Sequence, residues 1–340
     1  MTLTRRSLLQ SIAAGAAAAP FLGKSVLAAA LKKVRVQIGW IANAEYAGLW
    51  VGLEKNYFKD AGLDVSVTPG GPNAPDPLVV VAGGEADIGY TSWLPFLDAV
   101  AKGNDYVLFA AGFQSSPLGI ISLARKPILT AKDLVGARIL AQGPNEKTSI
   151  DATLALAGLP KDWTMVPTGF SPEPLVAGDG DGYTAFATNQ TITLEKMGLV
   201  RDKDFFFRSF DELGFKSYAE LAFCTRDYLA KNRQTLVDYV KANIKAYRDN
   251  EKDPAYAAKL AVDKYGADYG LDLEQQTRLN ELQIPIIRPN NDPSFKILTM
   301  NKDEVTGPMY AAAKASGRTN LPDVDKIFDF SIAEEAHASL

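Results

Sequence analysis

Alternating apolar and polar residues near the start of the chain predict a strand, a helix and a second strand. Val36, Ile38 and Trp40 alternate with polar residues or glycine, which is the period-2 pattern of a β-strand. From Tyr46 the apolar residues recur at helical spacing, and the alternation returns after Gly62. Strands connected by a helix in this way run parallel, and ligands bind outside their carboxyl ends. The turn between Trp40 and Tyr46 is therefore the first candidate for a binding site.

The pattern of apolar and polar residues along the whole chain predicts an α/β protein with two lobes and mainly parallel sheets. Further strands are expected at residues 86–90, 106–111, 138–141, 163–167, 181–187, 205–210 and 219–224. The segment Gly119–Ala124 is expected to cross into the second lobe, and strand 219–224 to return to the first. Lobe 1 would comprise residues 31–120 and 223–340, and lobe 2 residues 121–222, with the two crossings as a hinge. A single large doubly wound domain is the alternative.

Residues 1–30 have the features of an export signal and are set apart from the fold. Arg5 and Arg6 precede an alanine-rich apolar stretch, and Ala28–Ala30 supplies the small residues of a cleavage site. The paired arginines favour the twin-arginine route. A retained membrane anchor is the alternative, but Pro20 and nearby glycine and lysine residues interrupt the stretch before the ~20 apolar residues that a span needs. We expect an exported periplasmic protein whose mature chain is not inserted in the membrane.

Composition and charge exclude several classes of function. Residues 1–30 carry three basic and no acidic residues, so their removal changes the net charge from −4 to about −7, which disfavours binding to nucleic acid. Cys224 is the only cysteine and lies in an apolar run, which predicts a buried, inert thiol. His337 is the only histidine and lies in a polar C-terminal tail that is expected to fray. We therefore expect no catalytic residue, no metal site and no cofactor.

Aromatic and amide side chains recur at the predicted carboxyl ends of the strands. Aromatic faces stack on a planar ring, while amides and a carboxylate bind its edge. For any single aromatic residue a place in the core is the alternative, but the recurrence favours a site for the set. The expected ligand-binding residues are Trp40, Asn43, Glu45, Tyr46, Ser92, Trp93, Phe113, Gln114, Ser115, Gln142, Asn145, Tyr183 and Asn189.

The turn from Gln142 to Asn145 contains a glycine and is followed by a predicted helix. The N-terminus of a helix suits an anion or a carbonyl oxygen, so this turn is either part of the site or a simple connection. Lys147, near the start of that helix, leaves a ligand that carries phosphate possible if its side chain turns inward.

Four motifs carry a resemblance to a known family. They are Gly-Trp-Ile-Ala-Asn-Ala-Glu-Tyr-Ala-Gly-Leu-Trp at 39–50, Asn-Tyr-Phe-Lys-Asp-Ala-Gly-Leu-Asp-Val at 56–65, Ala-Gly-Gly-Glu-Ala-Asp-Ile-Gly at 82–89 and Lys-Asp-Leu-Val-Gly-Ala-Arg-Ile at 132–139. They resemble the periplasmic solute-binding proteins of ABC importers, in the branch that binds thiamine pyrimidine precursors, riboflavin, alkanesulfonates, taurine and nitrate. The resemblance runs from about residue 34 to at least Gly198. It implies a type II two-lobed fold, a small-molecule ligand, and an ABC permease and ATPase as partners. We expect a monomer.

The charge of the opening turn bears on the class of ligand. There is no Lys or Arg between Arg35 and Lys55, so Glu45 is the only charged side chain of the turn. A carboxylate facing a sulfonate or nitrate would be repelled by roughly 4 kcal/mol for unit charges about 4 Å apart at an effective dielectric constant near 20. We therefore expect a planar nitrogen heterocycle, such as a thiamine pyrimidine precursor or a flavin, rather than a sulfonate, taurine or nitrate. If Glu45 is only a solvated residue or a helix N-terminal carboxylate, the charge of the ligand stays open.

The resemblance also includes an enzymatic alternative. Some proteins of this fold are thiamine-pyrimidine synthases, which use a pyridoxal phosphate lysine, an active-site histidine and a cysteine-rich motif. This chain has neither a histidine in the matching turn, Asn43–Ala47, nor a cysteine cluster. A non-catalytic receptor for vitamin uptake is the expected role.

Overall fold

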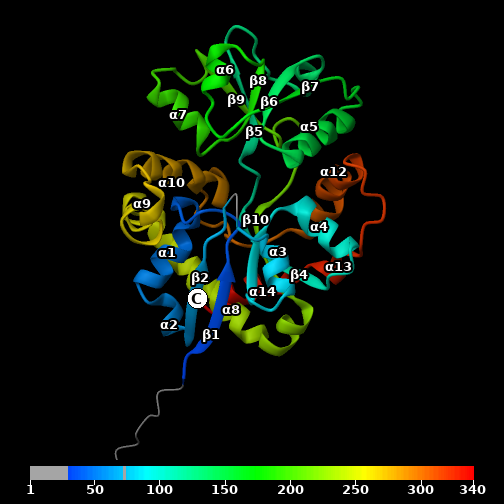
Figure 1. Cartoon of the computed structure of the whole chain (residues 1–340). Helices are drawn as coiled ribbons and strands as arrows, with labels where there is room; N and C mark the ends of the chain where they lie inside the picture. Colours follow the sequence, from blue (N-terminus) through cyan, green and yellow to red (C-terminus); the bar gives the residue numbers. More distant parts are fainter. Residues whose placement is uncertain (1–29, 72–73) are drawn as a thin grey trace, which may run out of the picture. The chain divides into compact units, whose positions relative to one another are not determined.

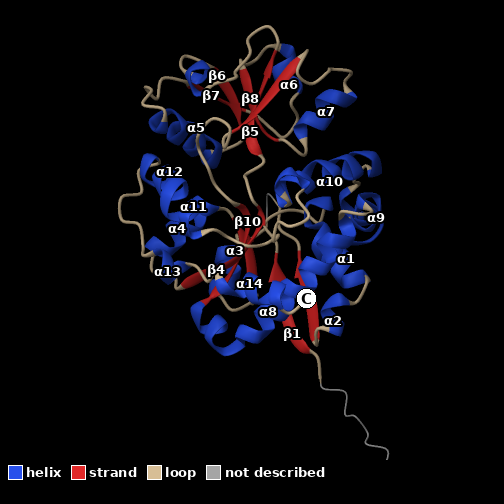
Figure 2. Cartoon of the chain, turned by 180° about the vertical axis from the view of Figure 1, so that it is seen from behind, coloured by secondary structure: helices blue, strands red, loops and turns tan. Residues whose placement is uncertain are grey.

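The strands form two five-stranded sheets in a computed structural model that describes residues 30–71 and 74–340 (Figure 1). The predicted export signal lies outside the described residues, except for Ala30. Helices surround each sheet (Figure 2). Among the described residues, no helix is both long and apolar enough to cross a membrane.

The first sheet has the strand order β2-β1-β3-β10-β4. Its strands are β1 (Lys32–Gln37), β2 (Leu63–Thr68), β3 (Ile88–Thr91), β4 (Tyr106–Phe113) and β10 (Ala219–Thr225). Strand β1 is parallel to β2 and β3, whereas β10 is antiparallel to β3 and β4. Four strands therefore run in one direction, and their carboxyl ends share one edge with the amino end of β10.

The second sheet repeats this arrangement with the order β7-β6-β8-β5-β9. Its strands are β5 (Leu118–Leu123), β6 (Arg138–Ala141), β7 (Thr164–Pro167), β8 (Gly182–Phe186) and β9 (Phe205–Ser209). Here β5 is the strand that runs against its neighbours, because it is antiparallel to β8 and β9. The two mixed sheets confirm the predicted α/β class with mainly parallel strands.

The predicted first crossing is wrong in one respect. Gly119–Ala124 does not connect the lobes, because residues 118–123 form strand β5, which is fully buried and pairs on both sides within the second sheet. The chain passes between the sheets at residues 114–117 and again at residues 210–218. The predicted return through strand 219–224 is confirmed by β10. The lobe boundaries themselves stay a prediction.

Helices and short helical turns fill the connections. The α-helices are α1 (Ala47–Glu54), α2 (Tyr57–Asp60), α3 (Pro77–Ala82), α4 (Trp93–Ala101), α5 (Pro144–Leu156), α6 (Glu173–Ala177), α7 (Gln190–Lys196), α8 (Arg226–Asn250), α9 (Pro254–Leu260), α10 (Leu273–Ile287), α11 (Lys302–Glu304), α12 (Tyr310–Ala315), α13 (Val324–Ile327) and α14 (Ser331–Ala338). The short 3-10 and π segments are η1 (Ala44–Tyr46), η2 (Ala131–Leu134), η3 (Ala261–Tyr265), η4 (Ala267–Tyr269), η5 (Pro289–Asn291) and η6 (Val305–Met309). Helix α1 packs against α8, and α12 packs against α5.

The C-terminal segment is not the frayed polar tail expected from the sequence. Ile332 and Ala333 of α14 are buried, so the segment is a packed helix. The His337 imidazole Nε2 lies 2.9 Å from the carbonyl oxygen of Ile297, and burial lowers its pKa. Cys224 is buried in β10 as predicted, and burial raises its pKa to about 12.

Candidate functional site

Two glutamates meet at the carboxyl edge of the first sheet. Glu45 lies in η1, the next element after β1, and its backbone N–H donates to the Asn43 side chain at 3.0 Å. Glu220 lies near the start of β10, next to Leu221, which pairs with the last residue of β3. The carboxyl groups of Glu45 and Glu220 hydrogen-bond to each other. The insertion of β10 between β3 and β4 thus brings an acid from a distant part of the chain to the opening turn.

The two acids form a pair that retains a proton. Burial raises the pKa of Glu45, and burial together with the charge of Glu45 raises that of Glu220. No Lys or Arg is among the groups that shift either pKa. Within the described residues, Oε2 of Glu220 is enclosed and has no hydrogen-bond partner. Two carboxyl groups in one buried site cannot both ionise without a cation, so the pair offers both a donor and acceptors.

Tyrosine side chains surround this acid pair. The rings of Tyr46 and Tyr90 meet edge to face at 6.1 Å between centroids, and the hydroxyl groups of Tyr90 and Tyr239 lie 3.0 Å apart. Burial raises the pKa of Tyr46, and the charges of Glu220 and Glu45 raise it further. The pKa of Tyr247 is raised mainly by burial, with contributions from the same two acids. The site is therefore aromatic and poor in cations.

Trp40 links the acid pair to the second sheet. Its backbone N–H donates to the Tyr46 hydroxyl at 3.1 Å. Its half-buried indole meets Phe170 edge to face, with ring centroids 5.6 Å apart. Phe170 lies in the loop after β7 and is 56% exposed. The carboxyl end of β1 in one sheet and that of β7 in the other are thus joined by an aromatic pair.

Two predicted residues, Gln142 after β6 and Tyr183 in β8, hold the loop that carries Phe170. The Tyr183 hydroxyl donates to the carbonyl oxygen of Gly169 at 2.8 Å, and Nε2 of Gln142 approaches the same oxygen at 3.5 Å. Gln142 also donates to the carbonyl of Thr184 at 3.0 Å and accepts from its hydroxyl at 2.5 Å. Residues that follow β6 and β7 are therefore hydrogen-bonded to residues within the neighbouring strand β8.

Other predicted residues make structural hydrogen bonds. Asn43 is buried, and besides capping η1 it accepts the Trp50 indole N–H through its carbonyl at 2.7 Å. Gln114 donates to the carbonyl of Thr299 at 3.1 Å. Asn189 accepts a hydrogen bond from Gln275 of α10 at 3.0 Å. These residues position the edge, and the structure gives no separate sign that they contact a ligand.

The remaining predicted residues lie elsewhere. Trp93 is buried against Tyr310 and Phe328, and its indole N–H donates to the carbonyl of Met309 at 3.2 Å, so it packs in the core. Phe113 is also buried in the core. Ser92 and Asn145 are exposed, and Ser115 is half-buried. Our candidate site does not use these five residues.

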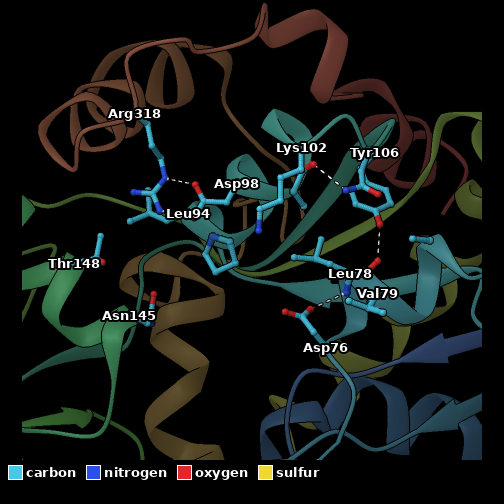
Figure 3. Close-up of a pocket in the computed structure, with 14 residues that line it drawn as sticks. Asp76, Leu78, Val79, Leu94, Asp98, Lys102, Tyr106, Asn145, Thr148 and Arg318 are labelled. Carbon is cyan, nitrogen blue, oxygen red and sulfur yellow. Dashed lines mark hydrogen bonds and ion pairs between the residues drawn. The ribbon is translucent and has the colours of Figure 1, made fainter.

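A cavity of about 460 Å³ has a lining that does not include Glu45 or Glu220. Figure 3 shows this cavity. Its walls come from α3, α4, the start of α5 and Arg318, and it includes only Asn145 of the predicted residues. The Arg318 guanidinium bonds both carboxylate oxygens of Asp98, at 2.6 and 2.7 Å. Lys147 does not turn inward, because its ammonium bonds Asp151 at 2.5 Å and lies over the Trp163 ring.

Four residues of the site were not predicted from the sequence, namely Glu220, Tyr90, Tyr247 and Phe170. One signal was available for Glu220, since it opens the apolar run of a strand that pairs on both sides, where a charge is unusual. No local pattern marked Phe170.

Comparisons with known proteins give the following findings. A family described as NMT1/THI5 like matches residues 43–257. The formylaminopyrimidine-binding protein of Halalkalibacterium halodurans is 25% identical over 289 residues, which cover 82% of this chain and 80% of that protein. The 4-amino-5-hydroxymethyl-2-methylpyrimidine phosphate synthase of Schizosaccharomyces pombe is 24% identical over 254 residues, with 72% of each chain covered. The periplasmic aliphatic sulphonate binding protein SsuA from Escherichia coli superposes with a TM-score of 0.63 at 15% identity, covering 87% of this chain and 96% of the other.

Proposed function

Because the chain belongs to the NMT1/THI5-like family and has the fold of the periplasmic binding proteins of ABC importers, we propose that it is the substrate-binding component of an ABC import system. Its ligand in this proposal is a planar aminopyrimidine of the thiamine precursor type. The mature chain would capture the ligand in the periplasm and deliver it to a permease with a cytoplasmic ATPase. The relative named for formylaminopyrimidine binding supports this choice.

The observation that carries the proposal is the acid pair of Glu45 and Glu220. An aminopyrimidine presents a ring nitrogen acceptor beside an exocyclic amino donor. A protonated carboxyl group matches both, because its O–H donates to the ring nitrogen and its carbonyl oxygen accepts from the amino group. If the ring nitrogen takes the proton, the same contacts become charge-assisted. Oε2 of Glu220 has no hydrogen-bond partner within the described residues, so it can make one of these bonds once the ligand reaches it.

A sulfonate fits the same groups poorly. It is an anion that only accepts hydrogen bonds, and the groups shifting the pKa values of the acid pair include no cationic side chain. Bringing it to two acids would require both to stay protonated, with no cation to offset its charge. The structural likeness to SsuA supports the fold and not this ligand.

A synthase is the second candidate, because relatives of similar identity carry that name. Against it, the single histidine lies in α14 with its ring against the carbonyl of Ile297, and the single cysteine is buried in β10. Among the described residues, neither His337 nor Cys224 has a contact with Glu45 or Glu220. We therefore propose a binding protein that does not alter its ligand.

Isothermal calorimetry of residues 31–340 with 4-amino-5-hydroxymethyl-2-methylpyrimidine tests the proposal. We expect binding by the wild type and a loss of about 10- to 100-fold for Glu220→Gln, which removes an acid while keeping its shape. At about 100 times Kd the ligand should add about 2.7 kcal/mol to the free energy of unfolding.

The exposed Glu85 supplies the matched control, and Glu85→Gln should bind like the wild type. Tighter binding of ethanesulfonate than of the pyrimidine would contradict the ligand class. Chemical change of the pyrimidine during incubation, followed by mass spectrometry, would contradict a role limited to binding.

A further inference from the structure

We propose that Phe170 is a ligand-binding residue that covers one face of the heterocycle while Trp40 lies against the other. This inference rests on the proposed function, since it takes the ligand to be a planar ring. It extends the site from the acid pair on the first sheet to a loop of the second.

The position of Phe170 is the first support. Its side chain is 56% exposed, and the ring partner that it has among the described residues is Trp40. Trp40 follows β1, and Phe170 follows β7, so the contact joins the carboxyl edges of the two sheets. Ligands of α/β sheets bind outside these edges. An apolar ring left partly in water at this edge would gain burial when a ligand arrives.

The anchoring of the loop is the second support. The carbonyl group of Gly169, one residue before Phe170, is held by the Tyr183 hydroxyl at 2.8 Å and approached by Gln142 Nε2 at 3.5 Å. The backbone is thereby held beside Phe170, whose side chain is more than half exposed. Gln142 and Tyr183 act in this view as positioning residues for Phe170.

The geometry of the ring pair defines the change that binding requires. The ring centroids are 5.6 Å apart, with an angle of 64° between the planes. A ring stacked between two others needs planes about 7 Å apart, because each carbon contact takes about 3.5 Å. Phe170 must therefore turn away from Trp40 and close over the ligand. The backbone N–H of Trp40 donates to the Tyr46 hydroxyl, and Tyr46 lies close enough to Glu220 and Glu45 for their charges to raise its pKa. In the proposal, a heterocycle on the indole directs its edge to the acid pair.

The test uses residues 31–340 and 4-amino-5-hydroxymethyl-2-methylpyrimidine as the probe, with Kd measured by calorimetry. We expect Phe170→Ala to weaken binding by about 10-fold and Phe170→Leu by about 3- to 10-fold, since leucine is apolar but has no ring face. Phe170→Tyr keeps the ring and should stay within about 3-fold of the wild type. Val200→Ala, which shortens another exposed apolar side chain, is the matched control and should leave the Kd unchanged.

A second readout follows the indole of Trp40. The probe should change tryptophan emission in the wild type, and this change should be lost in Trp40→Phe and reduced in Phe170→Ala. If Glu220→Gln weakens binding but Phe170→Ala and Phe170→Leu match the wild type, this inference is overturned and the proposed function stands. If the wild type does not bind the probe, the proposed function and this inference are both overturned.

Discussion

The backbone of Glu220 has φ +49°, in the left-handed region that L-residues other than asparagine and aspartate rarely adopt. On the neighbouring strand, a Cβ at Gly112 would lie only 2.8 Å from that of Glu220, so only glycine fits there. Strain of this kind costs on the order of 1–3 kcal/mol and persists where surrounding structure enforces it. Its coincidence with a half-buried acid whose Oε2 is enclosed supports the assignment of Glu220 to the site.

The pH dependence of stability should report the acid pair. Folding raises the pKa of Glu45 from 4.5 to about 7, so the folded protein keeps a proton that the unfolded chain releases. The resulting stabilisation is complete below pH 4.5 and is lost as the pH rises through about 7. Relative to Glu45→Gln, the wild type should lose on the order of 1–3 kcal/mol of unfolding free energy between pH 5 and pH 8.

Urea unfolding of both proteins at the two pH values measures this difference. Glu85→Gln, on an exposed turn, should follow the wild type at both. An equal difference between wild type and Glu45→Gln at pH 5 and pH 8 would show that Glu45 is ionised in the folded protein.

At the scale of elements, the helix predicted to begin at Tyr46 and to end at Gly62 is confirmed in type but is divided. It begins as η1, continues as α1, and is interrupted at Asn56, whose φ of +60° separates α1 from α2. Gly48 in α1 faces the ring of Tyr247 in α8, which a Cβ would approach to 2.4 Å. Close packing between helices, not helix propensity, explains this glycine.

Gly48→Ala should therefore destabilise the protein although alanine favours helix. Overpacking costs about 1–3 kcal/mol and the propensity gain is about 1 kcal/mol, so we expect a net loss of up to about 2 kcal/mol. Gly307→Ala is the control, because a Cβ there meets no atom within 4 Å. In thermal and urea unfolding, Gly48→Ala should be less stable than the wild type, and Gly307→Ala should be at least as stable as the wild type. The reverse order of stability would contradict the packing argument.

At the scale of the whole molecule, the two sheets differ in how the chain builds them. All five strands of the second sheet lie within residues 118–209, whereas the first sheet needs β10 from beyond that segment. The apolar core on one face of the second sheet, which includes Ile121, Leu175 and Phe205, comes from the same segment. Another cluster joins residues of both sheets, including Leu108 of β4 and Ile120 of β5.

A fragment of residues 116–212 should consequently fold by itself, but with lower stability than the whole chain, because the shared cluster is lost. Cooperative urea unfolding with a near-UV circular dichroism signal is the expected result. The complementary fragment 31–115, which lacks β10, should show neither property. A non-cooperative transition for 116–212 would count against the second sheet as an independently folding unit.

Local patterns were sufficient for the elements whose burial depends on near neighbours. The strands predicted after Gly62 and at residues 138–141 match β2 and β6, and Glu45 was singled out from the charge of its turn. These local patterns do not predict which distant segments pair with each other. Glu45 meets Glu220 only because β10 inserts between β3 and β4. The reason is physical. The periodicity of apolar residues indicates which side of a helix or strand is buried, whereas the segment that packs against that side depends on the packing of the whole chain.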